Sequence, residues 1–150
     1  MEKMKMGILG SGGIAHTMAN TVKQMADVEL YAVGARTLEK AQSFAEEFGM
    51  PKAYGSYEEL AADPELDLVY VATPHSHHYP HVKLLLEHGK NVLCEKAFTV
   101  NADQARELFQ MAEEKKLLLT EAIWTRYIPI QKTLNEVIES GAIGKVHSMT

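Results

Sequence analysis

An apolar segment that runs directly into a glycine-rich turn constrains the fold of this chain more than any other feature of the sequence. Residues 4–9 are typical of a buried strand, and residues 10–15 are Gly-Ser-Gly-Gly-Ile-Ala. In such a turn, Gly10 can make the tight bend out of the strand, Gly12 can let a pyrophosphate approach the backbone, and Ala15 is small enough for close packing of a helix on the strand. The pattern predicts a site for a dinucleotide.

The helix that follows the turn would present backbone N–H groups to the phosphates, because helix N-termini attract anions. These groups lie near Gly13 and Ile14, and Ser11 belongs to the same loop. A glycine turn that only connects a strand to a helix is the alternative. The context in the rest of the chain decides between the two.

Strands alternate with helices after this turn, and with 46% hydrophobic residues the chain of 150 can bury one substantial core. Such an alternation across short turns builds a parallel sheet covered on both faces. We therefore expect an α/β protein with a doubly wound parallel sheet, the Rossmann fold. Apolar runs and capping residues predict further strands over 28–33, 66–72, 91–95 and 117–120, and helices over 14–25, 37–48, 77–88 and 101–116, with a short helix after Ser56.

The last part of the chain, residues 121–150, differs from the rest. A helix is expected to begin at Pro129, and residues 145–150 are predicted to form a strand. Because a lone strand without a partner is marginal, we expect the chain to be a fragment of a longer two-domain protein. Residues 1–120 would form the Rossmann domain, and 121–150 the bridging helix and first strand of an incomplete C-terminal α/β domain for substrate binding and oligomerisation.

Charge and composition limit the partners. The net charge of −5 is spread along the chain without a basic patch, so neither nucleic acid nor an anionic membrane is an expected partner. The only cysteine, Cys94, is expected in the core, and a single cysteine favours a reducing compartment. No apolar run is long enough to span a membrane, and the early first strand leaves no room for a signal peptide. We therefore expect a cytoplasmic protein.

Small and polar residues follow each predicted strand. In an open parallel sheet, ligands lie at the carboxyl ends of the strands. The joint placement of these groups therefore favours a cofactor site over the separate interpretation of each as an ordinary loop. The groups are residues 10–14, 35–37, 73–78, 95–96 and 121–126.

The end of the second strand selects the cofactor. It reads Gly34-Ala35-Arg36-Thr37 and contains no acid, whereas an acid about 20 residues after the glycine pattern would bind the ribose hydroxyl of NAD. Arg36 can pair with the 2′-phosphate of NADP and stack on adenine, and Thr37 and Lys40 could add a hydroxyl and a charge. We therefore predict NADP rather than NAD, with Ala35 in the same loop. An exposed Arg36 without a ligand is the alternative.

Residues 73–81 contain four histidines, which invites a metal hypothesis. His77 and His81 could share a helix face, but a hydrolytic zinc site usually needs three protein ligands with a supporting shell. We therefore expect no metal here. The histidines either contact the cofactor or are ordinary surface residues. The residues assigned to the cofactor here are Ala72, Thr73, Pro74, His75 and His78.

Glu95 and Lys96 end a predicted strand and point to where a nicotinamide would lie. Reduction of a carbonyl needs a proton donor, and an ammonium can both donate the proton and stabilise developing negative charge. Lys96 is therefore the candidate acid/base, with a structural Glu95–Lys96 ion pair as the alternative. Trp124 and Arg126 would be stacking and polar contacts at the same pocket, or an anchor between domains.

Together these motifs resemble the Gfo/Idh/MocA oxidoreductases, over essentially the whole chain. The most specific part, residues 121–129, looks like the branch of dimeric dihydrodiol dehydrogenases, an NADP-linked group that acts on diols, sugars and dicarbonyls. The resemblance implies that Lys96 takes the catalytic place of the Glu-Lys-Pro motif and that His78 occupies the histidine position after Thr-Pro. It departs from the family at Ala97, where proline is usual. The other motifs that carry it are residues 10–15, 72–78 and 92–96.

The resemblance further implies an NAD(P)-dependent oxidoreductase that transfers hydride between a nicotinamide and a secondary alcohol or carbonyl of a sugar or small diol. Family members continue into a second α/β domain that supplies most of the substrate pocket and the usual oligomer interface, so a homo-oligomer is expected for the full protein. We expect little or no turnover from residues 1–150 alone. The alternatives are an isolated cofactor-binding module and a non-catalytic NADP-binding regulator, which would not need the Glu95-Lys96 pair.

Overall fold

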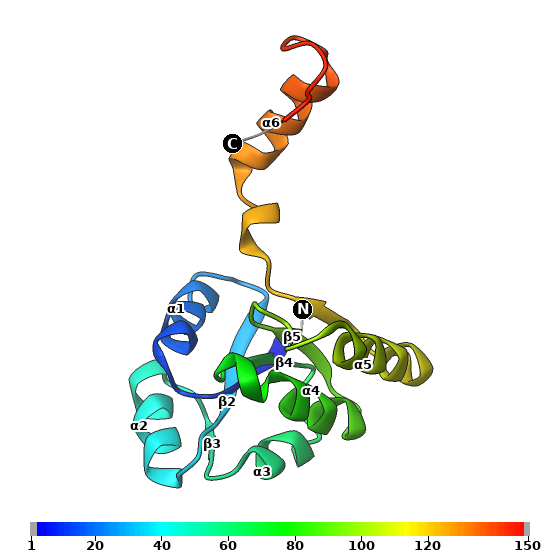
Figure 1. Ribbon diagram of the computed structural model, residues 1–150. Coiled ribbons are helices and arrows are strands. Elements are labelled where there is room, and N and C mark those ends of the chain that lie inside the picture. Colours follow the sequence, from blue (N-terminus) through cyan, green and yellow to red (C-terminus); the bar gives the residue numbers. More distant parts are fainter. Residues whose placement is uncertain (1–2, 149–150) are drawn as a thin grey trace.

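Six parallel strands form one sheet at the centre of the structure, a computed structural model that describes residues 3–148 (Figure 1). The strands are β1 (Met4–Leu9), β2 (Val28–Gly34), β3 (Lys52–Tyr54), β4 (Leu68–Val71), β5 (Asn91–Cys94) and β6 (Leu119–Glu121). Their order in the sheet is β3-β2-β1-β4-β5-β6, with parallel pairing throughout. This order reverses direction between β1 and β4, which is the doubly wound arrangement that the sequence predicts.

Helices cover both faces of the sheet (Figure 1). They are α1 (Gly13–Val22), α2 (Leu38–Phe48), α3 (Tyr57–Ala62), α4 (His78–Glu87), α5 (Ala102–Lys115) and α6 (Pro129–Glu139), with 3₁₀ turns η1 (His75–His77) and η2 (Trp124–Arg126). Helices α1 and α2 pack against the face that contains the fully buried Ile8 and Tyr70. Helices α3, α4 and α5 pack against the opposite face, where Leu9 and Val71 are fully buried. Within residues 3–148, no helix combines the length and apolar character needed to cross a membrane.

The predicted capping residues begin and end these helices. The Thr37 hydroxyl accepts a hydrogen bond from the Lys40 N–H at the start of α2. The Asn101 side chain accepts one from the Gln104 N–H, at 3.0 Å, at the start of α5. Gly49 ends α2 with a φ of +70°, a conformation in which glycine has no steric penalty. These local signals explain why the sequence places the first turns of both helices correctly.

Several element boundaries differ from the predictions by one to three residues, including that of β6, which begins at Leu119 rather than at residue 117. Strand β3 is not predicted at all, because its three residues are too few to show an alternating pattern. Helix α1 ends at Val22 rather than at Met25, which is 43% exposed. The strand expected over residues 66–72 covers only Leu68–Val71, because its ladder with β1 begins at Leu68.

The segment after β6 leaves the sheet and carries α6 away from the body of the molecule (Figure 1). Helix α6 begins at Pro129, as predicted, and none of its residues is buried. The strand expected over residues 145–150 does not form over 145–148, because no other strand in the described range lies beside this segment to pair with it. The last two residues of that expected strand lie outside the described residues.

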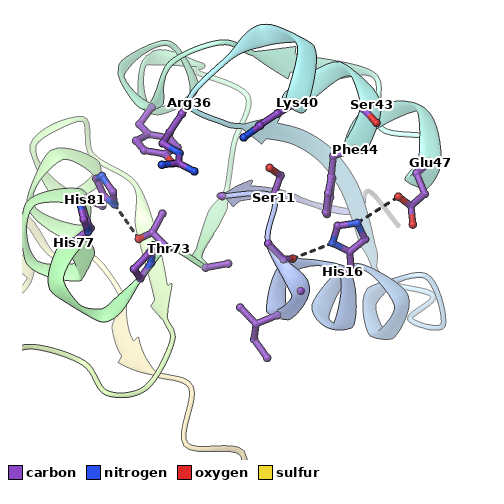
Figure 2. Close-up of a pocket in the computed structure, with 17 residues that line it drawn as sticks. Ser11, His16, Arg36, Lys40, Ser43, Phe44, Glu47, Thr73, His77 and His81 are labelled. Atoms are coloured by element: carbon purple, nitrogen blue, oxygen red, sulfur yellow. Dashed lines mark hydrogen bonds and ion pairs between the residues drawn. The ribbon is translucent and has the colours of Figure 1, made fainter.

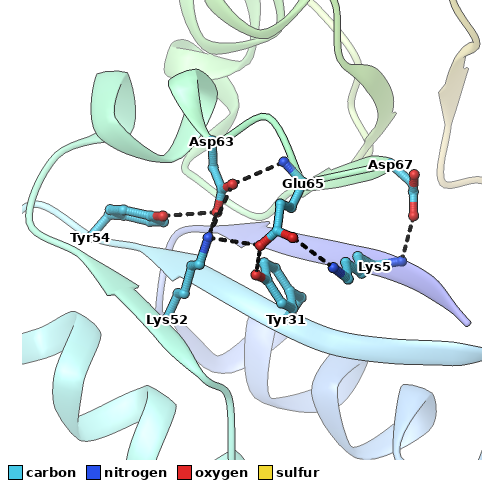
Figure 3. A network of polar contacts seen from close by, with 7 residues as sticks. All are labelled: Lys5, Tyr31, Lys52, Tyr54, Asp63, Glu65 and Asp67. Atoms are coloured by element: carbon cyan, nitrogen blue, oxygen red, sulfur yellow. Dashed lines mark hydrogen bonds and ion pairs between the residues drawn. The ribbon is translucent and has the colours of Figure 1, made fainter.

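A network of charged and phenolic side chains joins the amino ends of the strands, at the edge opposite the glycine turn (Figure 3). Lys52 contacts Asp63 at 3.1 Å and Glu65 at 3.2 Å, and Lys5 contacts Glu65 at 3.1 Å. The Tyr31 hydroxyl donates to Glu65 as well. The Tyr31 bond, followed by the bonds from Lys5 and Lys52, lowers the pKa of Glu65 from 4.5 to about 2. The network therefore holds paired charges at this edge at neutral pH.

Candidate functional site

An open cavity of about 620 Å³ lies at the carboxyl ends of the strands, between the glycine turn, helix α2 and the segment after β4 (Figure 2). This position is the expected one for a ligand in a doubly wound sheet, beside the point where strand order reverses. The structure brings ten of the predicted site residues together in its wall. They are Gly10, Ser11, Gly12, Gly13, Ile14, Arg36, Lys40, Ala72, Thr73 and Pro74.

The glycine turn leaves room for a ligand where the sequence predicts phosphate. Gly10 has a φ of +108°, and a Cβ there would lie 3.0 Å from the Ala72 carbonyl oxygen, so the bend requires glycine. A Cβ at Gly12 or Gly13 would meet no atom within 4 Å. Ala15 is fully buried in the contact between α1 and the sheet. The space above Gly12 and the helix N-terminus beside it therefore suit a pyrophosphate.

The wall formed after β2 is basic. Arg36 and Lys40 extend toward the cavity from the loop and from α2 (Figure 2), and no acid stands at the end of β2. Thr37 does not line the cavity, because its hydroxyl serves as the cap of α2. Ala35 is buried, and its N–H donates to the Tyr54 carbonyl at 3.1 Å. Arg36 and Lys40 are thus the groups on this wall that can pair with a phosphate.

Two of the histidines after β4 form the opposite wall. Thr73 Oγ1 lies 2.9 Å from His81 Nδ1, and the His81 ring stacks on His77 with centroids 5.7 Å apart. Tyr57 contacts the same ring edge-on at 4.6 Å. Burial, and then the nearby His77 and His78, lowers the pKa of His81 to about 4, so this ring is neutral at physiological pH. Among residues 3–148, no group of three or more histidine, cysteine or acidic side chains is arranged to hold a metal.

His78 lies in the core rather than in the cavity. It is fully buried, and its two ring nitrogens lie 2.8 Å from the Ala97 oxygen and 2.9 Å from the Thr73 oxygen. It is the first residue of α4. The structure therefore gives His78 backbone partners in the loops after β4 and β5, and its contact with the cofactor stays a prediction.

The loop that carries Lys96 is held by buried groups. Tyr70 donates its hydroxyl to Glu95 Oε1 at 2.6 Å, and the Lys96 N–H donates to Glu95 Oε2 at 3.1 Å. Burial, and then the bond to Glu95, raises the pKa of Tyr70, so the phenol keeps its proton. The Lys96 side chain is exposed, and no ion pair joins it to Glu95 in the described part of the chain. The ion-pair alternative is therefore not what the structure contains.

The remaining predicted residues lie outside the wall of the cavity. His75 is exposed in η1, and Trp124 and Arg126 are exposed in η2, beyond the carboxyl end of β6. Glu95 and Lys96 do not line the cavity either. The proposed roles of these five residues at the cofactor remain predictions.

Several wall residues lie on helix faces, whereas the sequence analysis predicts site residues only at the ends of strands. The periodicity of the helices offers a signal, because His16 follows Gly12 by one helical turn and so lies above the phosphate loop. Ser43 follows Lys40 by three residues and Glu47 follows Ser43 by four, so these side chains lie on one face of α2. The wall residues to which the sequence analysis assigns no cofactor contact are His16, Ser43, Phe44, Glu47, Tyr57, His77 and His81, of which it considers His77 and His81 only as metal ligands or surface histidines.

The strand order, the glycine turn and the cavity beside it place the chain among the nucleotide-binding proteins of the Rossmann class. The sequence is specific enough to go further. The chain belongs to the GFO_IDH_MocA oxidoreductase family, described as having an NAD-binding Rossmann fold, and the family pattern matches residues 4–123.

Similar proteins of known activity are dehydrogenases. The chain is 48% identical over 155 aligned positions to D-xylose 1-dehydrogenase (NADP(+)) of Hypocrea jecorina, covering 95% of this chain and 40% of that protein. It is 44% identical over 143 positions to trans-1,2-dihydrobenzene-1,2-diol dehydrogenase of Mus musculus, covering 94% of this chain and 43% of that protein. The chain therefore spans less than half the length of these relatives.

Solved structures share the fold. An NAD binding oxidoreductase from Klebsiella pneumoniae superposes with a TM-score of 0.88 at 29% identity, over 95% of this chain and 40% of that one. KijD10, a 3-ketoreductase from Actinomadura kijaniata in complex with NADP, superposes with a TM-score of 0.90 at 29% identity, over 96% of this chain and 46% of that one.

Proposed function

We propose that this chain is the NADP-binding part of a dehydrogenase or reductase that interconverts a secondary alcohol and a carbonyl on a sugar or small diol. The observation that carries the proposal is the basic wall of the cavity, where Arg36 and Lys40 stand without an acid at the end of β2. The relatives named above, a D-xylose dehydrogenase with NADP(+) and a dihydrodiol dehydrogenase, support the same class of reaction. The single buried cysteine is compatible with a reducing compartment such as the cytoplasm.

The chain offers a separate group for each part of the cofactor. The glycine turn would hold the pyrophosphate through backbone N–H groups at the start of α1. Arg36 would pair with the 2′-phosphate through its planar guanidinium, and Lys40 would add a second charge. Thr73 and Pro74, which line the opposite wall, would border the adenosine.

Lys96 would provide the acid/base chemistry. When bound, NADPH would supply the hydride for the reduction and NADP+ would accept it in the oxidation. The Lys96 ammonium would donate a proton to the substrate oxygen in the reduction, and the neutral Lys96 amine would take a proton from the substrate hydroxyl in the oxidation. The Tyr70–Glu95 bond and the bond from the Lys96 N–H to Glu95 hold the backbone from which the Lys96 side chain extends at the carboxyl edge of the sheet. The substrate pocket itself would need residues from a second domain, in keeping with the greater length of the relatives.

The cofactor assignment is tested by titrating the purified chain with NADPH and with NADH, in wild type and in Arg36→Ala. Charge-assisted hydrogen bonds contribute about 1.5 to 3 kcal/mol, so we expect the variant to bind NADPH about ten- to a hundred-fold more weakly. NADH binding should change little, because NADH lacks the 2′-phosphate. Arg106→Ala is the matched control, since Arg106 is exposed on α5 and its one ion pair is with Asp103 of the same helix. An equal preference in wild type and Arg36→Ala would contradict the assignment.

The catalytic assignment needs the longer protein in which this domain would operate. There, Lys96→Met should leave NADPH affinity within about three-fold and lower kcat by at least a factor of about 100, the lower end of the contribution usual for a general acid/base. Unchanged kcat in that variant would remove Lys96 from the mechanism.

A further inference from the structure

The loop after β5, residues 95–98, carries Lys96 and is held through its backbone by two carboxylates. The Lys96 N–H donates to Glu95 Oε2 at 3.1 Å. The Phe98 N–H, at the far end of the loop, donates to Glu121 Oε1 at 2.9 Å. One carboxylate therefore holds the backbone at the lysine itself, and the other holds it two residues further along the chain.

Strand pairing brings Glu121 to this loop. Glu121 is the last residue of β6 and lies beside Cys94, the last residue of β5, in the parallel ladder. The Ala122 N–H donates to the Cys94 carbonyl oxygen at 2.7 Å, so the pairing continues to the point where the loop leaves β5. The Phe98 ring is buried and contacts the Phe109 ring of α5, with centroids 5.2 Å apart. The far end of the loop is therefore fixed by an apolar contact and by the bond to Glu121.

A third side chain holds the middle of the loop. His78 Nδ1 lies 2.8 Å from the Ala97 carbonyl oxygen, and the ring is fully buried at the start of α4. Lys96 itself is exposed, and within the described part of the chain no ion pair joins it to Glu95 or Glu121. Both carboxylates bind backbone N–H groups instead, so the Lys96 side chain stays available to a substrate.

We infer that Glu121 is a positioning residue for Lys96, because it holds the Phe98 N–H and thereby fixes the shape of the loop from which the lysine side chain extends. The inference rests on the proposed function, in which Lys96 moves the proton. A displacement of a catalytic group by about 1 Å can lower a rate about a hundred-fold. A hydrogen bond to a carboxylate is stronger than one between neutral groups, so this bond restrains the loop firmly. Its loss should lower kcat and leave cofactor binding unchanged, since Glu121 does not line the cavity.

The test compares substitutions in the longer protein in which this domain would operate, with D-xylose, D-glucose and trans-cyclohexanediol as probe substrates and NADP+ as oxidant. Glu121→Met keeps the length of the side chain but removes the acceptor, whereas Glu121→Gln keeps an acceptor oxygen for the Phe98 N–H. We expect Glu121→Met to lower kcat about ten- to a hundred-fold, and Glu121→Gln to recover most of this loss. The dissociation constant of NADPH should stay within about three-fold of wild type in both. Glu113→Met makes the same replacement at an exposed position on α5 and is the matched control.

A double variant separates positioning from a general effect on the fold. If Glu121 acts through Lys96, the double variant Lys96→Met, Glu121→Met should have a kcat no lower than that of Lys96→Met alone, because the effects of residues that act as one unit are not additive. A loss by the same factor with and without Lys96 would overturn the proposal. A wild-type kcat in Glu121→Met, or a Glu121→Gln variant as slow as Glu121→Met, would overturn it as well. Thermal unfolding shows that each variant is folded at the assay temperature.

Amide hydrogen exchange gives a measurement that needs no substrate. In the chain of 150 residues, the Phe98 amide should exchange at least about ten-fold faster in Glu121→Met than in wild type, with Glu121→Gln between the two. Equal exchange in wild type and Glu121→Met would overturn the proposal, because the bond would then not hold the loop in solution. Failure of Lys96→Met to lower kcat, or of wild type to oxidise any of the three probe substrates, would instead refute the proposed function and this proposal with it.

Discussion

Replacing Gly10 or Gly12 by alanine should have different effects, although both residues lie in the same turn: the first change should lower stability, and the second should weaken cofactor binding. In Gly10→Ala, the new Cβ would lie 3.0 Å from the Ala72 oxygen on a backbone with φ of +108°. A non-glycine residue in such a conformation costs about 1 to 3 kcal/mol, and the contact with backbone atoms adds to this. We expect a loss of about 2 to 4 kcal/mol in the free energy of unfolding, or roughly 5 to 15 °C in melting temperature for a domain of this size.

In Gly12→Ala, the new methyl group meets no atom of the protein within 4 Å, and the residue's φ of −85° suits alanine. Alanine caps a helix less well than glycine, but it restricts the unfolded chain, which stabilises by about 0.4 to 1 kcal/mol. These effects offset each other, and the stability should stay within about 1 kcal/mol of wild type. The methyl group instead occupies the space proposed for the pyrophosphate, and the loss of charge-assisted bonds there should weaken NADPH binding about ten- to a hundred-fold.

Thermal unfolding and NADPH titration of the two variants, side by side, check both expectations. If Gly12→Ala unfolds as early as Gly10→Ala, the open space above Gly12 is not a property of the folded chain. If Gly12→Ala keeps its stability and binds NADPH as wild type does, no phosphate approaches this turn.

Three further predictions concern buried and paired groups. Glu65→Gln should remove stability that wild type has above about pH 4.5 and loses as the pH falls toward 2, because a tyrosine hydroxyl and then two lysines lower the pKa of this carboxyl from 4.5 to about 2 in the folded state. Urea titrations at about pH 7 and pH 3 measure this difference in the free energy of unfolding, with Glu46→Gln as the exposed control. An equal pH dependence of stability in wild type and Glu65→Gln would contradict the prediction. Tyr70→Phe removes the donor to the buried Glu95 carboxylate and should cost about 1 to 3 kcal/mol, seen as a lower urea midpoint; an unchanged midpoint would mean that this bond does not stabilise the fold. The ring resonances of His81 should not titrate above about pH 5, because burial and then the neighbouring histidines lower its pKa to about 4; an NMR titration centred near the ordinary histidine value would show that the ring is not buried in solution.

Local signals made the fold predictable from sequence. Thr37 and Asn101 cap their helices as expected, and Gly49 ends α2 in the left-handed conformation. The buried strands on both sides of β1 are apolar apart from Glu29 in β2, so each could be identified without knowing its neighbours. Strand β3 was not predicted because its three half-buried residues are too few to show an alternating pattern. It exists because the open edge of β2 offers it a backbone partner, which only the assembled sheet reveals.

The candidate site was predictable where it follows strand ends and unpredictable where side chains reach over from helices. The glycine turn and Arg36 line the cavity as expected. His16 and Glu47 meet across two helices at 3.3 Å although they are 31 positions apart in the chain, and no spacing rule connects them. His78 follows a strand end as well but is fully buried beside two backbone carbonyl oxygens, an orientation that the sequence does not indicate.

The paired charges at the amino edge of the sheet have a consequence for how such a protein can change over evolutionary time. Lys52, Asp63 and Glu65 satisfy one another at the opposite edge from the cavity (Figure 3), so the groups that would choose the cofactor share no partner with them. Distant sites without shared partners contribute almost additively to stability. Evolution or protein engineering could therefore replace Arg36 and alter the cofactor preference without changing the contribution of this charged network to stability.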